Sequence, residues 1–161
     1  MKLNLGCENK IIEWYINVDK FDLYEVDIND DLEKFPYPFE DDPVQEIILP
    51  HVLEHIGQSP EIFINILKEL FRVCKNQALI KISVHHPRYD NFISDPTHVR
   101  PIIIFAYLYL TELWKKNAAA NTPLALIHDF NFSIEDNSYD LEDVILTKFK
   151  IGEIDKPKLD Y

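Results

Sequence analysis

Residues 3–9 read Leu-Asn-Leu-Gly-Cys-Glu-Asn, the pattern of a strand that ends in a glycine turn. Leu3 to Leu5 match the end of a buried strand. Gly6 supplies the backbone freedom of a turn at which a ligand can lie close to the main chain. A second glycine is expected two positions later, and Glu8 stands there instead. Its side chain brings bulk and negative charge to a place where a ligand normally meets bare backbone.

The composition is that of one globular domain with an acidic surface. A chain of 161 residues that is 47% hydrophobic and 12% aromatic can bury one sizeable core. The formal net charge of −12 argues against nucleic acid as a partner, because phosphate binding requires clustered Lys and Arg. We therefore expect a single domain over residues 1–161 and a neutral, cationic or small substrate.

Cysteine usage and hydropathy predict a cytoplasmic protein. Cys7 and Cys74 are too few and too far apart for a disulfide framework or a Cys-rich metal site, so we expect reduced thiols. The N-terminus runs directly into the first expected strand, which is not the pattern of a signal peptide. The most apolar run, residues 102–110, is about half the length needed to span a bilayer. We therefore expect no membrane segment.

The most regular part of the sequence predicts a strand, a helix and a second strand. Residues 44–49 form a short apolar run typical of a buried strand. A helix entry at Ser59-Pro60 precedes apolar residues at helical spacing over 62–74. A turn at 75–77 then leads into a strand at 78–84. Such an order implies two parallel strands joined by a right-handed crossover.

Weaker signals predict the remaining elements. The helix expected after residue 97 is apolar nearly all the way round, so it is either well buried or half of a homodimer contact. Residues 155–161 are expected to form a loose tail. The further expected elements are strands at 3–5, 15–18 and 26–28, a helix from 97–101 to about 116, and an antiparallel hairpin of 124–134 and 141–151 around a polar turn at 135–138.

Several short motifs follow one another in an order that resembles a known family. They are Leu3-Asn4-Leu5-Gly6-Cys7, Asn17-Val18-Asp19, Asp31-Leu32, Phe35-Pro36-Tyr37-Pro38-Phe39, His51-Val52-Leu53-Glu54-His55-Ile56, Leu67–Lys75 and Asp95–Pro101. Together they resemble the class I S-adenosylmethionine-dependent methyltransferases, and more narrowly a small, type 11-like subgroup with a shortened first helix. The resemblance covers about two thirds of the chain. It implies an α/β fold: a Rossmann-like methyltransferase domain with a mostly parallel twisted sheet and an antiparallel C-terminal hairpin.

The resemblance implies S-adenosylmethionine as the cofactor, bound at the carboxyl ends of the strands. Asp19 would accept hydrogen bonds from the ribose hydroxyls. Asp31 would reach the exocyclic amine of adenine, and Leu32 would pack against the ring. Pro50 and His51 would lie beneath the sulfonium. The other implied cofactor contacts come from the glycine turn, Leu5, Gly6, Cys7 and Glu8. The alternatives to these cofactor roles are structural: Asp19 and Asp31 could cap turns, and Leu32 could belong to the core.

The sequence departs from the family pattern in three places. Gly6 and Asp19 are 13 positions apart, whereas a dinucleotide-type fingerprint takes about 20, which leaves room for a turn or a stub of helix. The usual proline–glycine turn before the fifth strand is replaced by Asn76-Gln77. Glu8 is the third departure: it could fold outward, meet the ammonium group of the cofactor, or close the site.

The segment His51-Val52-Leu53-Glu54-His55 also satisfies the H-x-x-E-H pattern of inverted zinc peptidases. Histidines at i and i+4 share one helix face and can hold one metal, with Glu54 beside them as the base. A third ligand would come from downstream, for example Glu112 or Glu135. Packing or capping roles for the two histidines are a further alternative.

A second polar cluster follows the fifth expected strand, and under the resemblance it faces the methyl acceptor. Its members are His85, His86, Arg88, Asp95, His98 and Arg100. Methyl transfer from a sulfonium is an in-line displacement that requires alignment and, for some acceptors, proton removal. We therefore predict catalytic roles for His51, His85 and His98. The predicted substrate contacts are His55, Arg88 and Arg100. A structural network around Asp95-Pro96 is the alternative.

The sequence thus predicts S-adenosylmethionine-dependent methyl transfer to an unidentified small molecule, without a metal, nucleic-acid or membrane partner. Two alternatives stay open. One is a non-catalytic relative that keeps the fold and serves as a binding or partner protein, with Glu8 in the glycine loop. The other is a zinc-dependent hydrolase that uses His51, Glu54 and His55.

Overall fold

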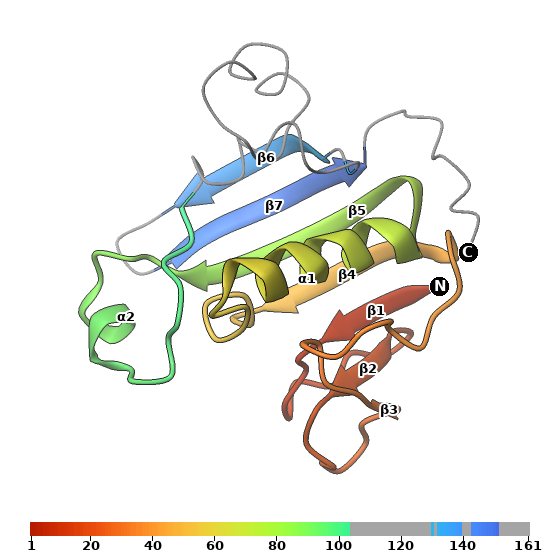
Figure 1. Cartoon of the computed structure of the whole chain (residues 1–161), viewed down its shortest axis with the longest axis horizontal. Helices are drawn as coiled ribbons and strands as arrows, with labels where there is room; N and C mark the ends of the chain where they lie inside the picture. The colour runs from red at the N-terminus through yellow and green to blue at the C-terminus, as the bar shows by residue number, and fades with distance from the viewer. Residues whose placement is uncertain (104–129, 131, 140–142, 152–161) are drawn as a thin grey trace.

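The computed structural model describes residues 1–103, 130, 132–139 and 143–151, and these form one seven-stranded sheet with a helix along it (Figure 1). The strands lie in the order β3-β2-β1-β4-β5-β7-β6. Their bounds are β1 Lys2–Leu5, β2 Ile16–Asp19, β3 Ile28–Asn29, β4 Val44–Pro50, β5 Cys74–His85, β6 Phe132–Tyr139 and β7 Asp143–Ile151.

The first five strands are parallel, and the order of the sheet reverses at β1. Leu3 pairs with Ile16 of β2 on one side and with Ile47 of β4 on the other. β2 and β3 extend the sheet in one direction from β1, whereas β4 and β5 extend it in the other. In open α/β sheets, ligands bind beyond the carboxyl ends of the strands at such a reversal.

Helix α1, Pro60–Val73, confirms the predicted strand–helix–strand unit. The Ser59 hydroxyl caps the helix by accepting a hydrogen bond from the Ile62 N–H at 3.1 Å. The apolar stripe of the helix joins the core formed by alternate residues of the central strands. The buried residues of α1 are Ile66, Leu67, Leu70, Phe71 and Val73.

Two sequence predictions around β5 and after it are wrong. The turn expected at residues 75–77 is part of β5, which begins at Cys74 directly after the helix. A shift in the β4–β5 register absorbs the extra residues, and Gln77 has a positive φ of 65°. Residues 97–103 contain no helix, and the sequence missed the short helix α2, Asp90–Ser94. The rest of the helix expected up to residue 116, and the dimer contact assigned to it, lie outside the described residues.

The C-terminal antiparallel hairpin is confirmed, but its turn is displaced. β7 pairs antiparallel with both β5 and β6. The polar residues 135–138, expected to form the turn, lie within β6, where two irregularities in the register accommodate them. The chain reverses instead between Tyr139 and Asp143. Residues 124–129 and the predicted tail 155–161 lie outside the described residues.

The connection from β1 to β2 contains turns and no helix, as its short length predicts. Cys7 and Cys74 are both buried thiols. Within the part of the chain that the structure describes, no helix combines the length and apolar character needed to cross a membrane.

Candidate functional site

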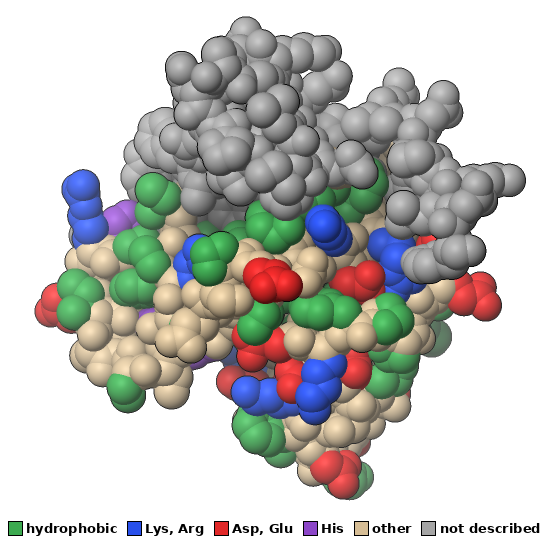
Figure 2. Space-filling view, viewed as in Figure 1, with side chains coloured by type: hydrophobic (Ala, Val, Ile, Leu, Met, Phe, Trp, Pro, Cys, Tyr) green, Lys and Arg blue, Asp and Glu red, His purple; other side chains and the backbone are tan. Residues whose placement is uncertain are grey.

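A pocket of about 350 Å³ lies beyond the carboxyl ends of β1, β2 and β4, at the reversal of the strand order, and we call it the switch-point pocket. In the space-filling view, a notch separates the β1–β3 region from the region of α2, and histidine side chains lie at its edge (Figure 2). The lining residues are Gly6, Glu8, Asp19, Lys20, Phe21, Asp30, Asp31, Leu32, His51, Val52, His55, Ile56 and Thr97.

Gly6 is required by packing as well as by backbone conformation. Its φ is 66°, and a Cβ at this position would lie 2.5 Å from Cγ2 of Val52. The N–H groups of Gly6 and Cys7 both donate to the carbonyl of Val18, at 2.8 and 3.1 Å. The glycine therefore allows Val52 to pack directly on the turn, and this side of the turn is closed by protein.

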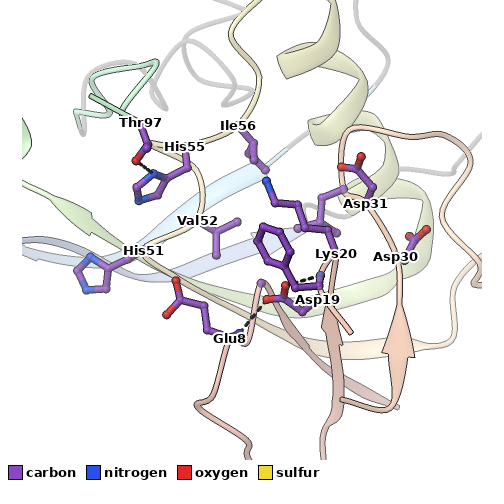
Figure 3. A pocket seen from close by; sticks show the side chains of 13 residues that line it. Glu8, Asp19, Lys20, Asp30, Asp31, His51, Val52, His55, Ile56 and Thr97 are labelled. Carbon is purple, nitrogen blue, oxygen red and sulfur yellow. Dashed lines mark hydrogen bonds between the residues drawn. The ribbon is translucent and has the colours of Figure 1, made fainter. Parts of the chain in front are cut away.

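The carboxylate of Asp19 holds the glycine loop in place. Its Oδ2 accepts from the Glu8 N–H at 2.8 Å, and its Oδ1 accepts from the Phe21 N–H at 2.9 Å (Figure 3). Asp19 is only 5% exposed. Glu8 has a positive φ of 48° and is exposed. Its side chain extends along the pocket on the side where His51 lies (Figure 3). Each Asp19 oxygen has one acceptor position left for a ligand.

Asp30 and Asp31 complete an acidic side of the pocket. Asp31 accepts from the Glu33 N–H at 3.1 Å and lies 3.6 Å from the Lys34 ammonium. Asp30 differs because its Oδ2 is buried and has no hydrogen-bond partner among the described residues. Burial raises the pKa of Asp30 above its usual value. We call Glu8, Asp19, Asp30 and Asp31 the carboxylate cluster.

On the opposite side, four histidine rings surround the buried carboxylate of Glu54. The centroid distances between rings are 4.5 Å for His51–His85, 4.5 Å for His55–His98 and 5.6 Å for His85–His98. Glu54 is 0% exposed. We call these five residues the histidine cluster. It combines three segments: the turn after β4, the end of β5, and the loop after α2.

Glu54 is held as a carboxylate by donors around its Oε1. This oxygen accepts from the His85 N–H at 3.1 Å and lies 3.4 Å from Nδ1 of His51. Burial alone would raise the pKa of Glu54, but hydrogen bonds from the His51 side chain and from backbone N–H groups outweigh burial and lower it. The Glu54 carbonyl accepts from the N–H groups of Val99 and Arg100, which fixes the later loop against this turn.

The H-x-x-E-H segment is not helical. His51 has a φ of 56°, and residues 53–55 form a turn. His51 and His55 therefore do not share a helix face, and Glu54 lies buried between separate histidine pairs. The geometry predicted from the zinc-peptidase pattern is wrong. Glu135, one of its proposed third ligands, lies on β6, and Glu112 lies outside the described residues.

The structure brings seven of the residues predicted from sequence to the pocket: Gly6, Glu8, Asp19, Asp31, Leu32, His51 and His55. Leu5 and Cys7 are fully buried, so only their backbone is near the site. Pro50 is not among the lining residues.

The remaining predicted catalytic and substrate residues lie behind or beside the pocket. His85 and His98 belong to the histidine cluster. Arg88 is exposed after β5. Arg100 donates from Nη2 to the Gly57 carbonyl at 2.8 Å and lies 4.4 Å from the centroid of the Phe63 ring. These contacts hold Arg100 against Gly57 and against the side of α1.

Sequence reasoning missed six lining residues: Lys20, Phe21, Asp30, Val52, Ile56 and Thr97. Lys20 and Phe21 directly follow Asp19, and Phe21 is 58% exposed, so an aromatic residue just after a ligand-binding strand end was the available signal. Thr97 had no such signal, because it lies on the loop after α2 and its hydroxyl contacts His55, 42 positions away in the chain.

Comparisons with known proteins agree with this topology. The sequence matches no protein-family model and no curated protein sequence. Among solved structures, it is similar to a SAM-dependent methyltransferase from Archaeoglobus fulgidus, with a TM-score of 0.52 and 20% identity over 87% of this chain and 66% of the other. The chain thus spans just under two thirds of that protein.

A second similar structure is the YcgJ protein from Bacillus subtilis, with a TM-score of 0.56 and 16% identity over 94% of this chain and 92% of the other. The strand order, the switch-point pocket and these likenesses together define the architecture. The chain has the fold of a class I S-adenosylmethionine-dependent methyltransferase.

Proposed function

We propose that this protein binds S-adenosylmethionine in the switch-point pocket and transfers its methyl group to a small molecule. The observation that carries the proposal is the carboxylate cluster at the carboxyl ends of the parallel strands. Four carboxylates line the pocket, against Lys20 as the only Lys or Arg among the described lining residues. The four carboxylates give the pocket a negative electrostatic potential, which favours a ligand with a positively charged sulfonium and ammonium group.

The residues present fit this cofactor. Asp19 retains acceptor capacity for ribose hydroxyls. The buried Oδ2 of Asp30 needs a donor, and the exocyclic amine of adenine supplies one. This favours Asp30 over Asp31, whose carboxylate already interacts with Glu33 and Lys34. Leu32 supplies an apolar surface, and Glu8 offers a carboxylate to the ammonium group.

His51 is the best placed of the three predicted catalytic histidines. It lines the pocket, and its Nδ1 lies 3.4 Å from Oε1 of Glu54. A carboxylate behind an imidazole orients the ring and stabilises the imidazolium that forms when the ring accepts a proton. The bound cofactor supplies an electrophilic methyl group. We propose that His51 receives the proton of the acceptor and that His55 contacts the acceptor beside it.

Calorimetry with S-adenosylhomocysteine tests cofactor binding. We expect a dissociation constant in the micromolar range for the natural protein. Asp30→Ala should weaken binding about tenfold because it removes one hydrogen bond to a charged acceptor. Asp22→Ala is the matched control, since Asp22 is an exposed carboxylate close in sequence that does not line the pocket. Absence of heat at millimolar ligand would overturn the proposal.

A non-catalytic relative is the second candidate, and the glycine turn supports it. Val52 packs directly against Gly6, and both Asp19 oxygens already accept backbone N–H groups. In such a protein, Glu8 would close the site rather than hold the ammonium group.

Glu8→Gly separates the two candidates. Glycine suits the positive φ of residue 8, so the change removes the side chain without straining the loop. If Glu8 holds the ammonium group, affinity for S-adenosylhomocysteine should fall several-fold. If Glu8 closes the site, affinity should rise from an undetectable level. Glu25→Gly is the matched control, because Glu25 also has a positive φ, of 66°, and lies outside the pocket.

A further inference from the structure

The histidine cluster contains polar atoms that the protein leaves unsatisfied in a buried place. Oε2 of Glu54 and Nε2 of His98 are both inaccessible to solvent, and neither has a hydrogen-bond partner among the described residues. The side chain of His98 is 2% exposed and the Glu54 side chain 0%. An unsatisfied buried polar atom is destabilising, so two such atoms close together indicate a site for a ligand.

The hydrogen bonds of His98 determine which of its nitrogens is available. Its Nδ1 lies 2.8 Å from the carbonyl of Phe92, and a carbonyl can only accept. Nδ1 therefore carries the proton, and the neutral ring presents a lone pair at Nε2. Among the residues that the structure describes, the ion-pair partner of Nε2 is Asp95, whose Oδ2 is 3.9 Å away, beyond hydrogen-bond distance.

The same reasoning applies to His55. The Thr97 hydroxyl donates its one proton to Oδ1 of Asp95 at 2.6 Å, so towards Nδ1 of His55, 2.9 Å away, it can only accept. Nδ1 of His55 is thus protonated, and its lone pair is also at Nε2. A histidine that donates one ring N–H to a carbonyl, or to a hydroxyl held by a carboxylate, has the hydrogen-bond arrangement typical of metal ligands.

We propose that Glu54, His55 and His98 bind a divalent transition-metal ion, with Zn²⁺ as the favoured ion. One ligand atom from each of the three residues lies within 4.8 Å of the other two. Two imidazoles and a carboxylate form a common zinc ligand set that leaves a coordination position open. The site adjoins the pocket through His55, which lines it.

A second trio, His51, Glu54 and His85, also brings one ligand atom of each residue within 4.8 Å of the other two, but it is a weaker candidate. Its carboxylate oxygen, Oε1, already accepts from the His85 N–H and lies beside Nδ1 of His51. The proposed site also differs from the zinc-peptidase pattern: His51 is not a ligand, His98 replaces a downstream glutamate, and Glu54 binds the metal instead of acting as the base.

Titration of the full chain, freed of metal with a chelator, tests the proposal. Zn²⁺ added in a calorimeter should bind with one-to-one stoichiometry, and Co²⁺ should produce visible d–d absorption. His98→Gln and Glu54→Gln should each weaken Zn²⁺ binding at least about 100-fold. His86→Gln is the matched control: it removes a nearby histidine outside both trios and should leave affinity unchanged.

Thr97→Val provides a readout that does not depend on removing a buried residue. It keeps the shape of an exposed side chain and deletes the hydroxyl behind His55, so affinity should fall about tenfold. If His98→Gln fails to fold, as judged by circular dichroism, His55→Gln replaces it. Absence of stoichiometric Zn²⁺ heat and of a Co²⁺ band, or equal losses in His86→Gln and the ligand variants, would overturn the proposal.

Discussion

The two sides of the pocket satisfy their polar groups in opposite ways. In the carboxylate cluster, Asp19 accepts two backbone N–H groups and thereby fixes its own loop. In the histidine cluster, Glu54 is buried deeper, and one of its oxygens meets no donor. The first cluster is formed by short loops near the surface, and the second by three segments that pack together behind the pocket.

The two clusters therefore depend on different interactions. The glycine loop needs a specific backbone shape, which neighbouring residues supply. The histidine cluster needs a buried anion, to which distant segments are attached. Changes to either cluster should therefore have distinct consequences for stability.

Glu54→Ala should destabilise the protein most, by about 3 kcal/mol, because it leaves the His85 N–H and the His51 side chain without their acceptor. Urea unfolding in the presence of a chelator measures this change without a contribution from metal. Glu40→Ala, at an exposed acidic position, should stay within about 0.5 kcal/mol. Equal effects of the two substitutions would contradict a structural role for the histidine cluster.

Gly6→Ala should cost about 2 kcal/mol, because the new Cβ would be strained at positive φ and would overlap Val52. The overlap can be separated from the strain with a double-mutant cycle that includes Val52→Ala. We expect the two substitutions together to cost less than the sum of the single changes. Strict additivity would show that Val52 does not close the turn.

Arg100→Ala should cost about 1.5 kcal/mol through loss of its hydrogen bonds to the Gly57 carbonyl and its stacking on Phe63. Arg100→Lys keeps the charge but not the planar fork, so it should recover only part of the loss. Thermal unfolding of the three proteins measures the series. Full recovery by Lys would mean that charge alone matters at this position.

The smallest effect concerns Glu46 of β4, which joins the two halves of the sheet through Lys2 of β1 and Lys81 of β5. Burial alone would raise its pKa, but these lysines and Tyr15 lower it to about 2, from 4.5 in an unfolded chain. The resulting stability is present above pH 4.5 and is lost as the pH falls towards 2. Solvent screening of the partly exposed lysines reduces it to about 1 kcal/mol.

Urea unfolding at pH 7 and pH 3 tests this linkage. The natural protein should lose more stability between the two pH values than Glu46→Gln, which has no carboxylate to protonate. Identical pH dependence of the two proteins would show that Glu46 does not join the halves of the sheet through its charge.

The sequence predicted most of the fold and named residues on both sides of the site. Apolar runs and helical spacing are local patterns, so β4, α1 and β5 could be located from neighbouring residues alone. Asp19 and Asp31 were implied as pocket residues by the family resemblance: Asp19 is the last residue of β2, and Asp31 lies two positions after the end of β3. The start predicted for the next helix, at residues 97–101, is wrong: residues 97–103 are not helical, and Ile102 is apolar because it is buried.

By itself, the sequence determined the strand order along the chain, the glycine turn, the shortened β1–β2 connection and the acidic character of the pocket, since each depends on residues close together in the chain. Only the tertiary structure decided that Val52 covers Gly6 and that His55, His98 and Glu54 meet. These contacts join segments up to 46 positions apart, and they form only when the ends of parallel strands and the loop after α2 come together at one edge of the sheet.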